Sequence, residues 1–247
     1  MKQRIIPFLA ALLMILLLQG CQKQQVNPEA TATSTKQAIK LPASRVALSQ
    51  TQVFIRKWTE WVLARDYSEA PWDDATGAKQ YAGQPYATGT MMLAGGSSPD
   101  LVTRDITISL SQYQQVFFPL VNFLSYWNDC YPGHPDNGNV PPGAVSSFIT
   151  EALNGKRTIV LNWDGQSLIT DKLKDFRSNS EYWQFSIHPS WDNGCIATAT
   201  TLYVDGFWAK VPLSLGTHTL EIAGDADIRR IKTPFSNHVI YHITVTN

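Results

Sequence analysis

The sequence has 247 residues, of which 20 are basic and 20 are acidic, so its formal net charge at pH 7 is zero. A nucleic-acid partner is disfavoured, because no run of lysine and arginine could form a phosphate-binding patch. The length allows one domain with a substantial core beyond any leader segment.

The first 20 residues are predicted to be a lipoprotein signal peptide. Two basic residues precede an unbroken apolar run over residues 5–18. This run is shorter than the roughly 20 residues that span a bilayer, but it suits the hydrophobic region of a secretory signal. The segment "LQGC" that follows resembles a bacterial lipobox, which implies that Cys21 is acylated and becomes the mature N-terminus. The alternative is an ordinary signal peptide with an incidental cysteine.

Residues 21–48 are predicted to be a flexible tether, because they are mostly Gln, Ala, Thr, Ser and Lys and almost lack large apolar side chains. Cleavage would remove two basic residues and no acidic ones, which leaves 18 basic and 20 acidic residues and a net charge near −2. Residues 49–247 are then expected to form a single domain.

This domain is expected to begin with a helix. Ser49 and Gln52 form a capping-box pattern, and the apolar residues that follow recur with the helical period. A second helix is expected after the Pro-Pro-Gly sequence at 141–143, and a short third one over residues 170–176.

Most other segments predict short β-strands, because they are rich in β-branched and aromatic residues and are separated by Gly, Pro, Asn and Asp. These strands do not alternate with long helices, which disfavours a parallel α/β sheet. The sequence therefore predicts a mainly β fold: an antiparallel β-sandwich, jelly-roll-like or Ig-like, with one N-terminal helix and one or two short peripheral helices.

One expected strand, over residues 116–121, is apolar on both faces, which is typical of a strand covered on both sides. Pro119 within it indicates an edge strand or a bulge. The loop over residues 128–139 lacks the spacing of an EF-hand, although calcium held by Asp129, Asp136 and Asn137 is an open alternative.

Two cysteines remain once Cys21 is set aside. Cys130 and Cys195 both lie in loop-like sequences, and disulfides persist outside the cytoplasm. We therefore expect them to form a disulfide, with two buried free thiols as the alternative.

Four of the eight tryptophans are followed within two positions by an aspartate. Flat aromatic faces stack on sugar rings while carboxylates accept hydrogen bonds from hydroxyl groups, so this pattern indicates a carbohydrate-binding rim. The alternative is that each tryptophan closes the core and each aspartate begins a turn. The candidate ligand-binding residues are Trp127, Asp129, Trp163, Asp164, Trp191 and Asp192.

No catalytic residue, metal site or cofactor is predicted. The sequence lacks G-x-S-x-G, HExxH, Walker and dinucleotide motifs. His238 and His242 share a strand face but stand roughly 13 Å apart, too far to chelate one zinc ion. His218 is interpreted as a packed histidine, because it is in register with Leu220 and Ile222.

A series of short motifs along about 190 residues resembles a family of uncharacterised bacterial proteins, secreted or lipid-anchored, that are tryptophan-rich near the start and β-rich thereafter. The resemblance implies a fold and an extracytoplasmic location, but no catalytic residue. Relatives often carry two cysteines at places where this chain has Gln80 and Ile106. The matching motifs are "WTEW" from Trp58, "DATG" from Asp74, "AGQ" from Ala82, "MLAGG" from Met92, "VTR" from Val102, "FFPLVN" from Phe117, "DGFWAKVPLSLGTHTL" from Asp205 and "YHITV" from Tyr241.

The sequence therefore predicts a lipid-anchored protein of the bacterial cell envelope that serves as a binding or accessory module. Its expected partners are the membrane, through the acyl anchor, and a glycan. The alternatives are a hydrolase of envelope or environmental glycans, and a structural envelope component without a small ligand.

Overall fold

The computed structural model describes the chain from residue 48 onward, with gaps. The described residues are 48–85, 88–97, 100–127, 149–150, 153–154, 158–169, 173–192, 194, 200–228 and 233–247, all within the unit Ala43–Asn247. The predicted signal peptide, the predicted tether up to residue 47, Cys21, the Cys130–Cys195 pair and Asp129 lie outside the described residues. The side chains of Trp127 and Asp192 lie outside them as well.

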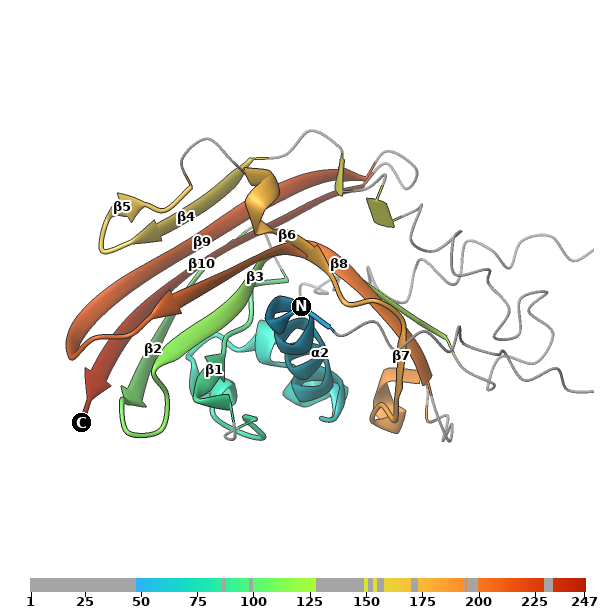
Figure 1. Ribbon diagram of the computed structural model, residues 1–247, viewed down its shortest axis with the longest axis horizontal. Coiled ribbons are helices and arrows are strands. Elements are labelled where there is room, and N and C mark those ends of the chain that lie inside the picture. Colours follow the sequence, from blue (N-terminus) through green and yellow to red (C-terminus); the bar gives the residue numbers. More distant parts are fainter. Residues whose placement is uncertain are drawn as a thin grey trace, which may run out of the picture. The chain divides into compact units, whose positions relative to one another are not determined.

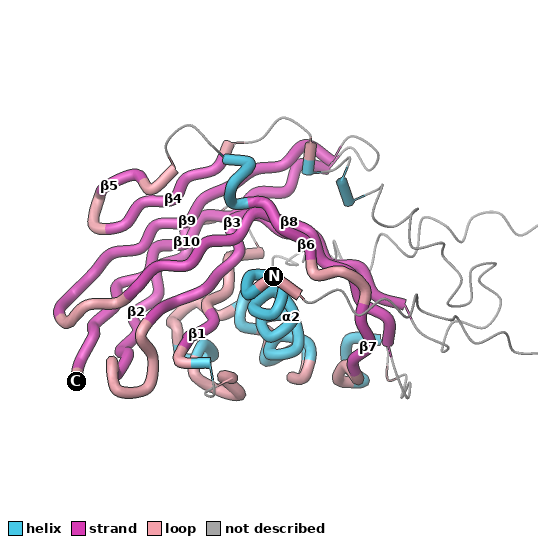
Figure 2. Tube along the Cα trace, viewed as in Figure 1, coloured by secondary structure: helices cyan, strands magenta, loops and turns pink. Residues whose placement is uncertain are grey.

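Two β-sheets pack face to face, and a layer of helix and loops covers the other face of one of them (Figures 1 and 2). The first sheet contains, in order, β1 (Thr90–Met92), β3 (Gln115–Trp127), β8 (Thr200–Pro212) and β6 (Arg177–Asn179), with β7 (Trp183–Phe185) also paired to β8. The second contains β2 (Leu101–Ser109), β10 (Thr233–Thr246), β9 (Gly216–Ile228), β4 (Ile159–Trp163) and β5 (Gln166–Ser167). The predicted mainly β sandwich is confirmed.

Each sheet includes one parallel pair, so both are mixed sheets and not the purely antiparallel sheets that were predicted. β1 is parallel to β3, and β2 is parallel to β10, whereas the other pairs are antiparallel. Parallel neighbours need a long crossover, and here the chain leaves the first sheet after β1, forms β2 in the second and returns as β3. The residue pattern within one strand does not indicate whether that strand runs parallel or antiparallel to its neighbour.

The predicted N-terminal helix is α2 (Gln50–Leu63). Ser49 and Gln52 form both hydrogen bonds of the capping box at its start. Its buried face includes Phe54, Trp58 and Trp61, and it packs against the first sheet. Short 3-10 helices follow at η1 (Tyr67–Glu69), η2 (Pro71–Asp73) and η3 (Ala78–Gln80), and later at η5 (Leu173–Phe176) and η6 (Pro189–Asp192).

The helix expected after residues 141–143 is described only in part. Ile149 and Leu153 have helical backbone and are buried in the core between the sheets. The segment expected to be helical over residues 170–176 contains the 3-10 helix η5.

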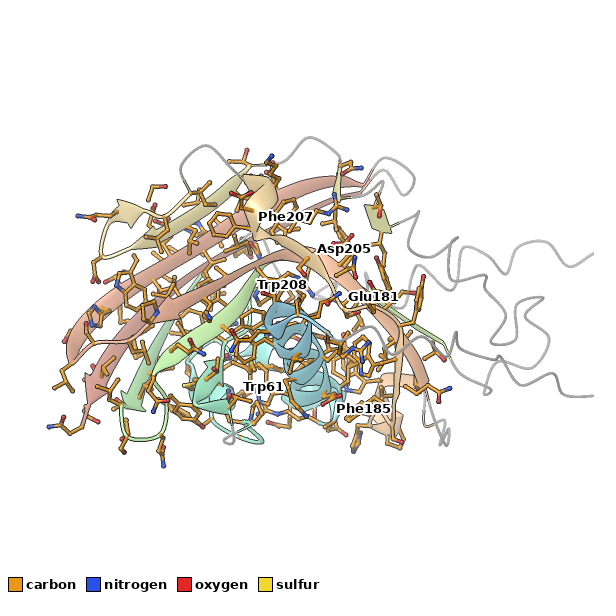
Figure 3. The ribbon with its side chains drawn as sticks, viewed as in Figure 1. Trp61, Glu181, Phe185, Asp205, Phe207 and Trp208 are labelled. Atoms are coloured by element: carbon orange, nitrogen blue, oxygen red, sulfur yellow. The ribbon has the colours of Figure 1, made fainter. Side chains whose placement is uncertain are left out.

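The first sheet is buried on both faces, as the two-sided apolar pattern of residues 116–121 predicts. Phe118 belongs to the core between the sheets, while Phe117 belongs to the core beneath α2. β3 is an inner strand, and its pairing with β8 is irregular at Pro119, which is the predicted bulge. On β8, Phe207 packs between the sheets, and Trp208 lies on the other face, in the core between this sheet and α2 (Figure 3). The Trp208 ring stacks on that of Phe117 at 5.5 Å.

A fully buried arginine joins the second sheet to the loops that follow α2. Arg104 of β2 is 0% exposed. Its guanidinium donates to five oxygens, at distances between 2.6 and 3.2 Å. The acceptors are the main-chain carbonyls of Trp72, Asp74, Ala94 and Gly95 and the hydroxyl of Tyr241. Main-chain dipoles thus replace the water that the cation has lost.

A second buried group, the carboxylate of Asp74, shapes the loop beside Arg104. Its two oxygens accept from the main-chain N–H groups of Thr76, Gly77 and Lys79 and from the side chain of Gln80. Gly77 has a φ of 96°, and a Cβ there would lie 2.8 Å from the Asp105 carbonyl, so glycine is required. The "DATG" motif is therefore a structural turn.

We predict that Arg104→Met lowers the free energy of unfolding by about 3–5 kcal/mol, because buried oxygens would lose their donor. Urea unfolding of the purified domain measures this. Lys57→Met is the control, since Lys57 forms only an exposed ion pair with Glu60 and should change stability by less than about 1 kcal/mol. A loss for Arg104→Met as small as that of the control would contradict the prediction.

The stability of the domain should also depend on the ionisation of Asp74. Burial by itself would raise the pKa of Asp74, but hydrogen bonds from the backbone of Thr76, Gly77 and Lys79 and from Gln80 lower it overall. A carboxylate with a lowered pKa stabilises the fold at pH values above the ordinary pKa of about 3.9. This stabilisation is lost as the pH falls through the lowered pKa.

We therefore expect Asp74→Asn to be less stable than wild type at pH 7, with the gap narrowing as the pH is lowered toward 2.5. Urea unfolding across this range measures the difference. A gap that stays constant with pH would show that the charge of Asp74 does not stabilise the fold.

Candidate functional site

Three aromatic rings meet at the end of α2, on the 3-10 helices that follow it and on η6. The ring of Trp191 lies 4.8 Å from that of Tyr67 and 5.1 Å from that of Trp72, with interplanar angles of 78° and 70°. These are edge-to-face contacts, which aromatic rings prefer. We call Tyr67, Trp72 and Trp191 the aromatic cluster.

The aromatic cluster is partly open to solvent. The side chains of Trp72 and Trp191 pack against the core beneath α2 and are half-buried, whereas Tyr67 is 40% exposed. Partial burial and the charge of Asp73 raise the pKa of the Tyr67 hydroxyl, so this group stays protonated at neutral pH. The cluster thus presents both apolar rings and a hydrogen-bonding group.

Trp191 is held in place by two further hydrogen bonds. Its indole Nε1 donates to the carbonyl of Arg65 at 2.7 Å, at the end of α2. Its own carbonyl accepts from the hydroxyl of Tyr126 at 2.8 Å, on β3. Tyr126 precedes Trp127, so the end of β3 lies beside η6. The structure therefore brings the backbone of Trp127 and the side chain of Trp191 to the same end of the sandwich.

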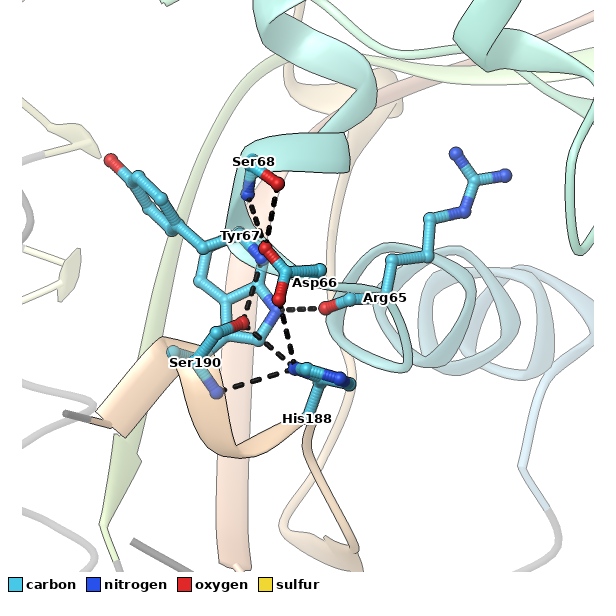
Figure 4. Close-up of polar contacts among 7 residues, drawn as sticks. Arg65, Asp66, Tyr67, Ser68, His188 and Ser190 are labelled. Atoms are coloured by element: carbon cyan, nitrogen blue, oxygen red, sulfur yellow. Dashed lines mark hydrogen bonds and ion pairs between the residues drawn. The ribbon is translucent and has the colours of Figure 1, made fainter. Parts of the chain in front are cut away.

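A small polar network lies beside these rings (Figure 4). Ser190 Oγ accepts from the backbone N–H of Tyr67 and lies 2.8 Å from His188 Nδ1. Asp66 Oδ1 accepts from both the N–H and the hydroxyl of Ser68. These hydrogen bonds from Ser68 lower the pKa of Asp66, which therefore stays anionic to more acidic pH. The network joins η1 to η6.

The Ser190–His188–Asp66 set is not arranged as a catalytic triad. In a triad the serine and the carboxylate occupy opposite nitrogens of the imidazole. Here Ser190 Oγ and Asp66 Oδ2 both approach Nδ1, the second at 3.8 Å, which is too long for a hydrogen bond. Nδ1 also accepts from the N–H of Ser190, so the ring serves to fix the turn.

The other predicted pair, Trp163 and Asp164, lies elsewhere. Trp163 ends β4 and packs against the core between the sheets, not the core beneath α2. In Figure 1 the β4–β5 hairpin lies at the opposite end of the molecule from β7, after which η6 follows. The three predicted tryptophans therefore do not share one surface.

His218 is packed, as predicted, but it also has a carboxylate partner. Its ring stacks on Trp163 at 4.9 Å, and its Nδ1 lies 2.8 Å from Asp164 Oδ2. This pairing joins positions 54 residues apart, and no pattern within either segment indicates it.

Two residues of the aromatic cluster were not among the predicted candidates. Trp72 is followed by Asp73 and so carries the same tryptophan–aspartate signal as the others. Tyr67, Asp66 and His188 carry no such signal, because they become neighbours of Trp191 only in the folded chain.

Among the described residues, no group of three or more His, Cys, Asp and Glu side chains is arranged to hold a metal ion. None of the described helices is long and apolar enough to cross a membrane. Comparisons of the chain with protein-family models, with curated proteins and with solved structures each gave no match.

The hydrogen bonds of Trp191 predict a contrast between two mild substitutions. Trp191→Phe keeps an aromatic ring but loses the bond from Nε1 to the Arg65 carbonyl, so it should lower the free energy of unfolding by about 1 kcal/mol or more. Tyr67→Phe removes a partly exposed hydroxyl and should change it by less than about 0.5 kcal/mol. Urea unfolding of both variants measures the contrast, and equal effects would contradict the assigned roles.

Proposed function

We propose that this protein is a lipid-anchored carbohydrate-binding module of the bacterial cell envelope, and that the aromatic cluster contacts the sugar. The observation that carries the proposal is a partly exposed set of three rings in edge-to-face contact through Trp191, whose indole is fixed by a hydrogen bond, with carboxylates beside them. No other surface of the described residues combines these features.

The rings suit a sugar because its axial C–H groups form an apolar face that stacks on an aromatic ring. Trp72 and Trp191 are already ordered by packing and by hydrogen bonds, so binding would cost little further side-chain entropy. Tyr67, the most exposed of the three rings, is the one most open to a ligand.

The polar border suits the hydroxyl groups of the same ligand. Asp66 keeps Oδ2 outside its hydrogen bonds to Ser68, and Asp73 is exposed, with Oδ1 bonded to the hydroxyl of Ser97. Glu69, which lies between Asp66 and Asp73 in the sequence, is also exposed. A border with three carboxylates favours neutral or cationic sugars and repels acidic ones.

The membrane anchor is proposed from the sequence, through acylation of Cys21. The tether over residues 21–48 would reach on the order of 30 Å if it behaves as a flexible coil. The same proposal places the protein outside the cytoplasm, as the resemblance of its motifs to secreted bacterial proteins implies. There the expected bond between Cys130 and Cys195 would persist.

Binding should be lost selectively when Tyr67 is removed. We expect Tyr67→Ala to weaken the binding of a neutral oligosaccharide by roughly tenfold, which corresponds to about 1.4 kcal/mol. A glycan array identifies the ligand, and isothermal titration calorimetry then measures its affinity. Tyr81→Ala is the matched control, because Tyr81 is also 40% exposed but lies outside the aromatic cluster.

The proposal is wrong if the wild-type domain binds no glycan, or if both tyrosine variants bind as well as wild type. The melting temperature of each variant, measured in parallel, separates loss of binding from loss of fold.

Acylation of Cys21 has its own test. Cys21→Ala should leave an unprocessed precursor, because the cysteine is the site of both acylation and cleavage. The protein should then no longer partition into the detergent phase when cell extracts are fractionated. A variant that is cleaved normally and still partitions with the membrane would refute the anchor.

A further inference from the structure

A second polar cluster lies at the opposite end of the molecule, where two turns of the sandwich meet. Asp164 lies in the turn between β4 and β5, Ser214 in the turn between β8 and β9, and His218 near the start of β9. We call these three residues the Ser214 cluster.

In the Ser214 cluster the hydroxyl, the imidazole and the carboxylate are arranged in space as nucleophilic catalysis requires. Asp164 Oδ2 lies 2.8 Å from His218 Nδ1, and Ser214 Oγ lies 3.1 Å from His218 Nε2. The carboxylate and the hydroxyl thus occupy opposite nitrogens of one imidazole, which is the arrangement of a serine–histidine–aspartate triad. Both distances allow hydrogen bonds.

The carboxylate is held rigidly toward the imidazole. Asp164 Oδ1 accepts a hydrogen bond from the N–H of Thr219 at 2.8 Å. The backbone N–H of Asp164 in turn donates to the carbonyl of Thr219 at 2.8 Å. Asp164 and Gly165 have φ values of 51° and 76°, as in the two-residue Asp-Gly turns that close β-hairpins. The turn therefore fixes the direction of the Asp164 side chain.

The imidazole is fixed as well. The side chain of His218 is 11% exposed, and its ring stacks on Trp163. Burial lowers the pKa of His218, but hydrogen bonds to Asp164 and to the Ser214 carbonyl raise it more, so the net shift is upward. The carbonyl oxygen of Ser214 lies 3.0 Å from Nε2, where it accepts a hydrogen bond when Nε2 carries a proton. The surroundings thus stabilise the imidazolium that a general base forms.

The other carboxylate–histidine pairs of the described residues lack this order. His188 has its serine and its carboxylate on the same nitrogen. His242 pairs with Asp105 at 3.0 Å, and His238 with Glu221 at 3.0 Å, without a serine at hydrogen-bonding distance from the ring. Ser214 is exposed, and the neighbouring Leu215 is 53% exposed, so a substrate can reach the hydroxyl and meet an apolar side chain.

We propose that the Ser214 cluster hydrolyses esters of small apolar acyl groups, with Ser214 as nucleophile and His218 as general base. Ser214 Oγ attacks the ester carbonyl carbon while its proton passes to His218 Nε2. The bond from that carbon to the alcohol oxygen breaks, the alcohol leaves with this proton, and an acyl-serine remains. Water, deprotonated by the same imidazole, then releases the carboxylic acid and restores Ser214. Asp164 is a positioning residue that keeps Nε2 toward Ser214.

The test uses p-nitrophenyl acetate and the purified chain from residue 22 onward. Ser214→Ala and His218→Gln should each lower the rate of p-nitrophenol release by about 100-fold or more, the range of general-base catalysis. His242→Gln is the matched control, because its imidazole also pairs with an aspartate, and it should keep the full rate. Intact mass and peptide mapping of the wild type should show an acetyl group on Ser214.

The pH dependence of the rate distinguishes a positioning role of Asp164 from a purely structural one. The rate should rise with pH as His218 loses its proton, through a midpoint above the ordinary histidine pKa of about 6.5. Asp164→Asn should shift this midpoint downward while the melting temperature shows the variant to be folded. Full activity in Ser214→Ala, or acetyl groups on other residues alone, would overturn the proposal and leave the Ser214 cluster as a hydrogen-bonded turn. Neither result bears on the aromatic cluster, which shares no residue with it.

Discussion

The described layers of the domain depend on the hydrogen bonds made by the buried guanidinium of Arg104. A cation inside a protein is costly unless several acceptors replace its water. Here the acceptors come from three places: the loop after α2, the segment that follows β1, and Tyr241 on β10. The burial of one side chain on β2 therefore requires these segments to be in place together, and it fastens the two sheets to the loop layer.

The candidate site is connected to this interaction. The carbonyl of Trp72, a member of the aromatic cluster, accepts from Arg104, while the indole of Trp191 is bonded to the end of α2. Surface rings that would otherwise lie on mobile loops are thus tied to the core. Many of the motifs that suggest a family resemblance belong to the same network: the turn at Asp74, the buried Gln84, and the residues Ala94, Arg104 and Tyr241. Their shared role is structural.

The sequence predicted features that depend on local periodicity, and it did not reveal those that depend on pairing between distant segments. The capping box and the apolar face of α2 were recognisable, and so was the two-sided apolar character of β3, because each follows from side-chain spacing within one segment. The parallel pairs could not be predicted, because they depend on how distant strands are placed. The burial of Arg104 and the contact between Asp164 and His218 could not be predicted either, because an isolated arginine or aspartate is typical of a solvated position. Within the aromatic cluster, Trp191 was predicted because an aspartate follows it, whereas no sequence pattern indicated Tyr67.

The most direct test of the central role of this network is native-state hydrogen exchange of the Gly77 and Lys79 amides. Both donate to the buried carboxylate of Asp74, in the loop whose backbone Arg104 holds. If the network fastens the loop layer to the sheets, these amides should exchange only through global unfolding, with an opening free energy equal to that of the core strands. Exchange through a local opening of much lower free energy would show that the loops move independently of the sandwich and would contradict this account.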